Sequence, residues 1–162
     1  MNFEQITTFI FDVDGVFTNN EIILTESGEF LRSMNVRDGM ALKIAVEKGY
    51  NFGIITGGTS KGVVERFQKF GIQLIYSGVF QKKEALFEIK EKLNITRQEI
   101  LYMGDDIPDI AVFDHVGIAC CPNDAITEIK NKADYISPIN GGHGCVRDVI
   151  EKVLRMKKDW PV

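Results

Sequence analysis

The stretch Ile6-Thr7-Thr8-Phe9-Ile10-Phe11-Asp12-Val13-Asp14-Gly15 decides the fold of this chain. Ile6–Phe11 is apolar and β-branched apart from its two threonines, which is typical of a strand at the centre of a sheet. Two carboxylates and a glycine follow the run directly. Ligands of open α/β sheets bind outside the carboxyl ends of the strands. This stretch therefore predicts a central strand that leads into a functional loop.

Three further apolar runs resemble strands and are closely followed by polar residues. These runs, each with the residues that follow it, are Phe52–Ile55 with Thr56-Gly57, Leu74–Tyr76 with Lys82, and Ile100–Met103 with Gly104-Asp105-Asp106. Loops at the carboxyl ends of parallel strands converge on one crevice. Each segment alone indicates little, but four in this order, each at a strand end, predict a single site for phosphoryl transfer.

Apolar runs alternate with segments of helical period, and this pattern of repeated βαβ units predicts an α/β fold. The length of 162 residues suits a single domain, residues 1–162. The remaining expected strands are Val116–Cys120 and Tyr135–Ile136. The expected helices are Asp38–Lys48 with Asp38 as its N-cap, 60–70 beginning at Ser60, Lys83–Leu93, Ala125–Asn131 and Cys145–Met156.

One segment, about residues 17–34, interrupts the α/β alternation. Glu21–Leu24 and Glu29–Met34 read as two extended arms around Thr25-Glu26-Ser27-Gly28, which is a hairpin signal. An isolated β-hairpin is only marginally stable in water. We therefore expect this hairpin to pack against its own domain or against a neighbouring subunit.

Composition excludes several classes of partner. The net charge of −4 provides no general attraction to nucleic acid or to membranes. No apolar run approaches the ~18–20 residues that span a bilayer, and Met1–Gln5 does not begin a signal peptide, so we expect a cytoplasmic protein. Cys120, Cys121 and Cys145 have neither metal-site nor disulfide spacing. The adjacent Cys120 and Cys121 end an apolar run and are interpreted as buried, inert thiols.

Asp12 and Asp14 form the first candidate pair. Residues i and i+2 of an extended loop project to the same side, so both carboxylates can face one bound group. Two close carboxylates repel each other and one tends to keep its proton, which suits a nucleophile beside a general acid/base. Gly15 would allow the chain to turn tightly. The alternative is a surface turn with two solvated acids.

Asp105, Asp106 and Asp109 bring more negative charge to the same place. A hard divalent cation would relieve it, and Mg²⁺ is typically bound by one or two carboxylates, waters and a substrate phosphate. We therefore assign Asp105 to metal binding. For Asp106 and Asp109 the competing interpretation is helix capping and backbone contact, and both interpretations stay open.

Thr56, Gly57 and Gly58 lie between a strand and a helix, where a hydroxyl and free N–H groups can bind phosphate oxygens. The alternative is a glycine loop selected only for tight turning. Lys82 begins a helix, where a cation is not favoured by the helix dipole, so an anionic partner is indicated. Its neighbour Lys83 could equally be the lysine that points inward.

These assignments together describe a phosphatase. Asp12 would attack phosphorus, and Asp14 would protonate the leaving alkoxide and then activate water. Mg²⁺ and Lys82 would neutralise charge, and Thr56 would hold an oxygen. An aspartyl-phosphate intermediate divides one high barrier into two smaller ones.

In these motifs the chain resembles the haloacid dehalogenase-like phosphatases. Asp12–Thr18 looks like the first motif of that superfamily, Thr56 like the second, Lys82 like the third and Gly104-Asp105-Asp106 like the fourth. Within the superfamily, the chain resembles the capless 3-deoxy-D-manno-octulosonate 8-phosphate phosphatases. Nearly the whole chain takes part in the resemblance, including the hairpin, Asn35–Gly39 and Gly141–Gly144.

The resemblance implies a Rossmann-like, doubly wound and mostly parallel sheet with a hairpin after the first strand and no cap domain. It also implies a homotetramer in which a neighbouring subunit closes each site, which would explain what the hairpin packs on. Metal ligation would fall to Asp12, Asp105 and the backbone carbonyl of Asp14. The implied sugar-phosphate contacts are Asn35, Val36, Arg37, Asp38, Gly39, Lys43 and Arg66, although Arg37, Lys43 and Arg66 could equally be solvated cations.

Two departures from the family pattern concern the substrate. Arg is usual where this chain has Gly58 and His143, and losing a guanidinium removes a bidentate grip on carboxylate or phosphate. His143 could reach a substrate or a neighbouring subunit, or it could be a flexible exposed side chain. The expected substrate is 3-deoxy-D-manno-octulosonate 8-phosphate, with a nonulosonate 9-phosphate of the sialic acid type as the alternative.

Two other classes of function compete with this interpretation. One is a catalytically idle oligomeric or regulatory domain. The acids argue against it, because a scaffold has no need to hold mutually repelling carboxylates together. The other is a phosphoprotein phosphatase or a phosphotransferase, because a capless monomer would admit large substrates.

Overall fold

A computed structural model describes residues 1–162, and its main sheet consists of six parallel strands. The strands stand in the order β5-β4-β1-β6-β7-β8, which confirms the predicted doubly wound sheet with its first strand at the centre. Their bounds are β1 Thr8–Phe11, β4 Asn51–Thr56, β5 Leu74–Ser77, β6 Ile100–Met103, β7 Ile118–Cys121 and β8 Tyr135–Ile136.

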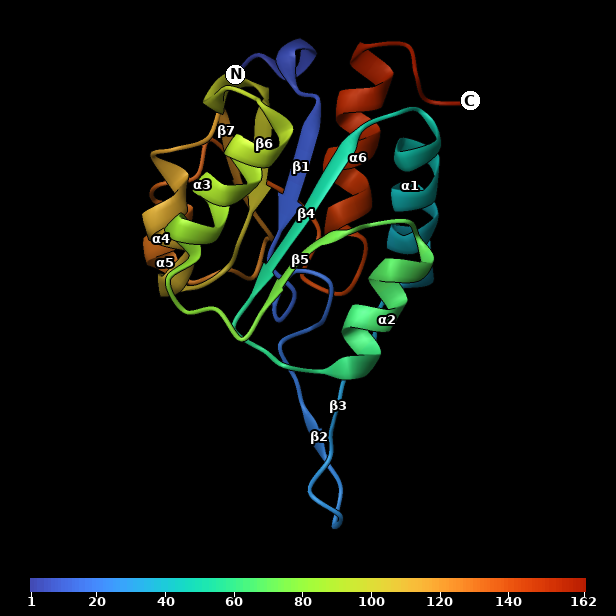
Figure 1. Cartoon of the computed structure of the whole chain (residues 1–162), viewed down its shortest axis with the longest axis vertical. Coiled ribbons are helices and arrows are strands. Elements are labelled where there is room, and N and C mark those ends of the chain that lie inside the picture. The colour runs from blue at the N-terminus through green and yellow to red at the C-terminus, as the bar shows by residue number, and fades with distance from the viewer.

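Helices cover both faces of the sheet (Figure 1). One face carries α1 (Val36–Glu47), α2 (Lys61–Lys69) and α6 (Cys145–Met156). The other face carries α3 (Lys82–Leu93), α4 (Ile107–Phe113) and α5 (Thr127–Lys130). Two short 3₁₀ turns, η1 (Phe3–Gln5) and η2 (Arg97–Glu99), precede β1 and β6.

Strand β1 is central because both of its faces are apolar. Phe9 and Phe11 join the core beneath α1 and α6, whereas Ile10 joins the core beneath α3 and α4. All three side chains are fully buried, as the alternation of side chains along a strand requires. The strand thereby places the loop that begins at Asp12 in the middle of the carboxyl edge of the sheet.

The predicted hairpin is present as β2 (Ile23–Leu24) and β3 (Phe30–Leu31), which pair antiparallel. It projects from the carboxyl edge of the sheet, away from the body of the subunit (Figure 1). Both arms are shorter than the sequence indicates, and Ile23, Leu24 and Phe30 are 64%, 68% and 60% exposed. The chain is capless, since this hairpin is its only insertion after β1.

The start of α1 differs from the expectation. Asn35, not Asp38, is the N-cap, and its side chain accepts a hydrogen bond from the backbone N–H of Arg37. Asp38 is completely buried in the first turn, and its Oδ1 accepts the N–H of Arg147 at 2.7 Å. Asp38 therefore caps the neighbouring helix α6, so its prediction as the N-cap of α1 is wrong, and its contact with substrate stays a prediction.

Burial raises the pKa of Asp38 to about 6, against the bond from Arg147 that lowers it. The native state therefore keeps a proton that the unfolded state loses, so stability falls as pH rises through this range. Asp38→Asn removes the titration. The free energy of unfolding of Asp38→Asn minus that of wild type, measured with urea, should rise by roughly 2–3 kcal/mol as the pH increases from about 4 to about 7. A difference between the two proteins that does not vary with pH would contradict this assignment.

Cys120, Cys121 and Cys145 are free and buried, and burial raises the pKa of each thiol, that of Cys121 to about 11. The predicted burial of Cys120 and Cys121 is thus confirmed. None of the helices combines the length and the apolar character that crossing a bilayer would need.

Candidate active site

The four strand-end segments meet at one pocket of about 190 Å³ at the carboxyl edge of the sheet. Residues predicted from sequence that line it are Asp12, Asp14, Thr56, Gly57, Gly58, Lys82, Asp105 and Asp106. Four lining residues were not predicted, namely Asn20, Val79, Phe80 and Pro108. The expected convergence of the loops is therefore confirmed.

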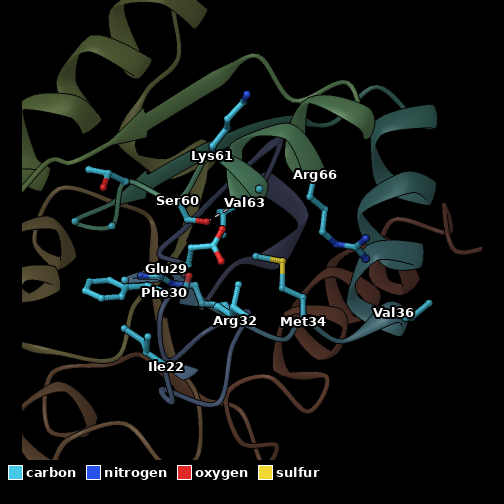
Figure 2. Close-up of a pocket in the computed structure, with 16 residues that line it drawn as sticks. Ile22, Glu29, Phe30, Arg32, Met34, Val36, Ser60, Lys61, Val63 and Arg66 are labelled. Atoms are coloured by element: carbon cyan, nitrogen blue, oxygen red, sulfur yellow. Dashed lines mark hydrogen bonds between the residues drawn. The ribbon is translucent and has the colours of Figure 1, made fainter. Parts of the chain in front are cut away.

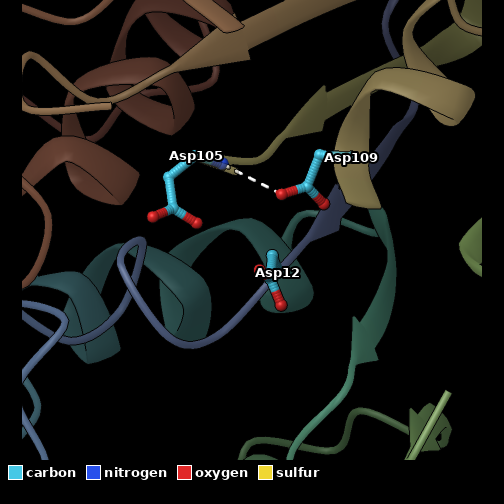
Figure 3. Close-up of side chains that lie close together, drawn as sticks. All are labelled: Asp12, Asp105 and Asp109. Carbon is cyan, nitrogen blue, oxygen red and sulfur yellow. Dashed lines mark hydrogen bonds between the residues drawn. The ribbon is translucent and has the colours of Figure 1, made fainter. Parts of the chain in front are cut away.

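Three acids form the centre of the site, and Figure 3 shows their side chains gathered together. One carboxylate oxygen each from Asp12, Asp105 and Asp109 lies within 4.8 Å of the others. Burial first, and then repulsion from Asp109, raises the pKa of Asp12 to about 7. Burial together with the charges of Asp12, Asp109 and Asp106 raises the pKa of Asp105 to about 8. The protein thus holds a concentration of negative charge that it only partly compensates.

Lys82 supplies part of the compensation. Its Nζ lies 2.9 Å from Asp12 Oδ2 and 2.7 Å from Asp109 Oδ1, and its side chain is only 4% exposed. Burial acts to lower the pKa of Lys82, but Asp109 and Asp12 outweigh it and raise the pKa. Lys83 is exposed, so Lys82 is the lysine that points inward.

Asp109 and Asp106 organise the loop after β6. Asp109 is completely buried, and its Oδ2 accepts the N–H groups of Asp105 and Asp106 at 3.0 and 3.2 Å. Tyr102 donates its hydroxyl to the other oxygen of Asp109. Asp106 is the N-cap of α4, with Asp109 completing a capping box. Capping accounts for the contacts of Asp106 and of Asp109 Oδ2, whereas Asp109 Oδ1 pairs with Lys82 and Tyr102. The sequence did not reveal the bounds of α4.

The acids fit a hard divalent cation. Asp105 Oδ1 is buried and has no hydrogen-bond partner, which is costly unless a ligand satisfies it. Gly15 is required beside it, because a Cβ there would lie 2.0 Å from Asp105 Oδ2, and its φ is +83°. Carboxylate oxygens are the donors that Mg²⁺ prefers. Asp12 and Asp105 are the residues placed to hold such an ion.

Two contacts from the ends of the hairpin were missed by the sequence analysis. Arg32 donates from Nε and Nη2 to the two oxygens of Asp14, at 2.6 and 3.1 Å. Asn20 donates from Nδ2 to Asp105 Oδ2 at 3.0 Å. Asp14 therefore has a cationic partner of its own and is not simply one of two mutually repelling acids.

Thr56 ends β4 almost completely buried, and its Oγ1 accepts the N–H of Gly58 at 3.1 Å. A Cβ on Gly58 would lie 3.2 Å from Arg32 Nη2 and 3.3 Å from Asp14 Oδ2. Gly58 thus leaves room for the Arg32–Asp14 pair. The hydroxyl and the small residues line the acid pocket, and phosphate binding by this loop stays a prediction.

The implied sugar-phosphate contacts are not gathered around the acids. Val36 and Arg66 line a groove of about 960 Å³ between the hairpin and α2, drawn in Figure 2 with Arg32 and Met34. Gly57 and Gly58 line both this groove and the acid pocket, so the two adjoin. Arg37 and His143 line a different groove, of about 610 Å³, along α6.

The remaining implied contacts have structural partners within the chain. Asn35 caps α1, and Lys43 is exposed with Glu47 3.9 Å away. A Cβ on Gly39 would lie 2.8 Å from Phe70 and 3.1 Å from Arg66, whose guanidinium lies over the Phe70 ring. These residues contact other parts of the chain and do not line the acid pocket, and their contact with substrate stays a prediction.

Comparison with known proteins agrees with the geometry. The family model of the haloacid dehalogenase-like hydrolases matches residues 60–150. This match, the fold and the acid pocket together define a hydrolase of this class. The 3-deoxy-D-manno-octulosonate 8-phosphate phosphatase KdsC of Escherichia coli K12 is 37% identical over 151 residues, which cover 93% of this chain and 80% of the relative. The chain belongs to the family of these octulosonate 8-phosphate phosphatases.

Solved structures of that family superpose closely. The enzyme of the same name from Yersinia pestis matches with a TM-score of 0.95 and 32% identity, over 97% of this chain and 85% of that one. The Moraxella catarrhalis enzyme, solved with a magnesium ion, a phosphate ion and a KDO molecule, matches with a TM-score of 0.91 and 32% identity, over 94% and 88%.

Proposed function

We propose that this chain is a Mg²⁺-dependent phosphomonoesterase that hydrolyses 3-deoxy-D-manno-octulosonate 8-phosphate to KDO and phosphate. The observation that carries the proposal is the convergence of Asp12, Lys82 and Asp105 beneath Thr56, with a buried carboxylate oxygen of Asp105 left without a partner. The octulosonate phosphatases to which the chain is similar support the choice of substrate.

Asp12, Asp105 and the backbone carbonyl of Asp14 would hold the Mg²⁺ ion. The ion, when bound, would supply the charge that keeps both carboxylates ionised and neutralises phosphoryl oxygens. The raised pKa values of Asp12 and Asp105 support this assignment, because the cluster lacks positive charge by itself. The Moraxella catarrhalis structure contains magnesium and phosphate together, which also supports it.

The first chemical step forms a bond between an oxygen of Asp12 and phosphorus. The bond between phosphorus and the sugar oxygen breaks, and a proton on Asp14 passes to that oxygen, so the sugar leaves as an alcohol. Lys82, 2.9 Å from Asp12, neutralises charge that gathers during the transfer. Thr56 and the N–H groups of the loop after it hold the phosphoryl oxygens.

The second step returns the enzyme to its starting state. A water molecule attacks phosphorus and gives its proton to Asp14, and the bond between phosphorus and Asp12 breaks. Inorganic phosphate leaves, and Asp14 holds the proton needed for the next cycle. Asp14 thus acts first as an acid and then as a base, which requires its carboxylate to stay in one place through both steps.

We propose that the active assembly is a homotetramer in which a neighbouring subunit closes the site. The cytoplasmic location stays a prediction. The exposed apolar side chains of the hairpin support an assembly, because a solitary hairpin with 60% of Phe30 exposed is unfavourable in water. Arg37 and His143 line a groove other than the acid pocket, which agrees with contacts between subunits. Sedimentation equilibrium tests the assembly, and a monomer would contradict it.

A substrate screen with metal removal tests the function. We expect the octulosonate 8-phosphate to be hydrolysed with a kcat/KM at least about 10-fold above a nonulosonate 9-phosphate and generic sugar phosphates, since binding energy from the sugar acid lowers the barrier. Chelation should abolish the activity and added Mg²⁺ should restore it. Faster hydrolysis of the nonulosonate would reassign the substrate, and turnover that survives chelation would exclude the metal role.

A further inference from the structure

The two ends of the hairpin each send a side chain into the active site. Asn20 precedes β2, and Arg32 follows β3 directly. Asn20 contacts Asp105, and Arg32 contacts Asp14. No other side chain of the chain donates a hydrogen bond to either carboxylate. The same hairpin therefore contacts both the proposed metal ligand and the proposed acid/base.

The contact between Arg32 and Asp14 is bidentate and largely sheltered. Nε and Nη2 of the guanidinium meet the two carboxylate oxygens at 2.6 and 3.1 Å, and the Arg32 side chain is 8% exposed. Paired N–H···O bonds of this kind fix the plane of a carboxylate as well as its position. Lysine provides one charge without the planar fork, so it would hold the carboxylate less firmly.

Asn20 contacts only one of the two carboxylate oxygens of Asp105. The Asn20 amide occupies Oδ2 at 3.0 Å, and Oδ1 is the oxygen left buried without a partner. Asn20 has a φ of +68°, in the left-handed region that asparagine tolerates better than most residues. With this backbone conformation the Asn20 amide donates to Asp105 Oδ2, and Oδ1 stays available to a ligand.

We propose that Asn20 and Arg32 are positioning residues, through which the hairpin holds Asp105 for metal binding and Asp14 for proton transfer. This proposal rests on the proposed function of the site and adds to it a role for the hairpin inside its own subunit. Partners that orient metal ligands commonly change affinity or activity 10–100-fold when they are removed. The two contacts can be tested separately because they act on different carboxylates.

Asn20→Gly tests the metal contact without disturbing the backbone, since glycine accepts positive φ. Mg²⁺ binding is measured by titration calorimetry, and we expect the Kd to rise about 10-fold. Asn94→Gly is the matched control, because Asn94 also has positive φ, at +51°, but caps α3 far from the acids. An unchanged Kd in Asn20→Gly, or an equal change in Asn94→Gly, would overturn the role of Asn20.

Arg32→Met tests the proton-transfer contact through the dependence on leaving group. An alkyl phosphate needs a proton on its departing oxygen, whereas 4-nitrophenyl phosphate releases a stable anion. We expect the ratio of kcat/KM for the octulosonate 8-phosphate to that for 4-nitrophenyl phosphate to fall on the order of 10-fold, with partial recovery in Arg32→Lys. A loss of folded enzyme lowers both values equally and leaves this ratio unchanged.

The outcomes separate the positioning roles from the function of the site. Wild-type protein that binds Mg²⁺ and hydrolyses the sugar phosphate, beside variants with unchanged Kd and unchanged ratio, would overturn the positioning roles alone. Wild-type protein that neither binds Mg²⁺ nor releases phosphate would overturn both proposals. A higher ratio in Arg32→Met would show that Arg32 restrains Asp14 and does not orient it.

Discussion

Asp12→Asn should reduce phosphate release at least about 10⁴-fold, since removal of a covalent nucleophile leaves only binding and electrostatic stabilisation. An amide does not form the acyl phosphate on which both steps depend. The effect should fall on kcat, because the phosphate-binding residues Thr56 and Lys82 are unchanged. Steady-state release of inorganic phosphate, measured with saturating Mg²⁺, is the appropriate assay.

The same variant should fold normally. Burial raises the pKa of Asp12 to about 7, so a neutral side chain of the same shape meets less resistance to burial than the carboxylate does. The side-chain carbonyl of the variant can also accept the N–H of Val13, as Asp12 Oδ1 does at 2.7 Å. Asp114→Asn, at an exposed acid, is the control for charge. Turnover within a few-fold of wild type in folded Asp12→Asn would exclude Asp12 as the nucleophile.

Lys82→Met should damage both stability and activity. Removal of the lysine leaves Asp12 and the completely buried Asp109 without their cation. Breaking a buried ion pair by removing one partner typically costs about 3–5 kcal/mol. For a chain of this size that loss corresponds to a fall in melting temperature of roughly 6–20 °C. Activity of the folded variant should fall about 10²–10³-fold, as for the loss of one group that stabilises transition-state charge.

Lys83→Met is the matched control, because the neighbouring lysine is exposed. It should change the melting temperature and kcat by little, since exposed substitutions are usually within about ±0.5 kcal/mol. Calorimetric melting in the absence of metal separates the stability effect from ion binding. Equal behaviour of the two lysine variants would mean that Lys82 does not hold the acids together.

The sequence predicts the sheet and the acid pocket well because both follow from strong local patterns. Ile6–Phe11 is apolar apart from two threonines, which favours a central strand, and the site residues lie at strand ends or a few residues beyond them. The convergence of Asp12, Lys82 and Asp105 needs no side-chain detail, since parallel strands fix which ends meet.

The contacts of the hairpin could not be predicted in the same way. Arg32 lies 18 residues from Asp14, and Asn20 lies 85 residues from Asp105. Nothing periodic in the sequence marks either pair, because the path of the hairpin in space decides which side chains reach the acids. The one available signal was an Arg beside a hairpin that must lie at the carboxyl edge of the sheet.

The helix caps show a different limit. Asn35 and Asp38 are both good capping residues one turn apart, and composition does not decide between them. Packing decides, because Asp38 is needed at the start of α6, where it accepts the N–H of Arg147. Asp109 is similar, since its two backbone bonds depend on the loop after β6 closing onto α4. Local sequence identified the residue types but not the helix that each one serves.

Borohydride trapping during turnover tests the central claim most directly. The reagent reduces an aspartyl phosphate to homoserine, which peptide mass spectrometry locates along the chain. We predict homoserine at position 12 in wild-type protein turning over substrate with Mg²⁺, and none when substrate is omitted. Modification at position 14 or 105 instead, or rapid turnover with no trapped residue at position 12, would contradict the account.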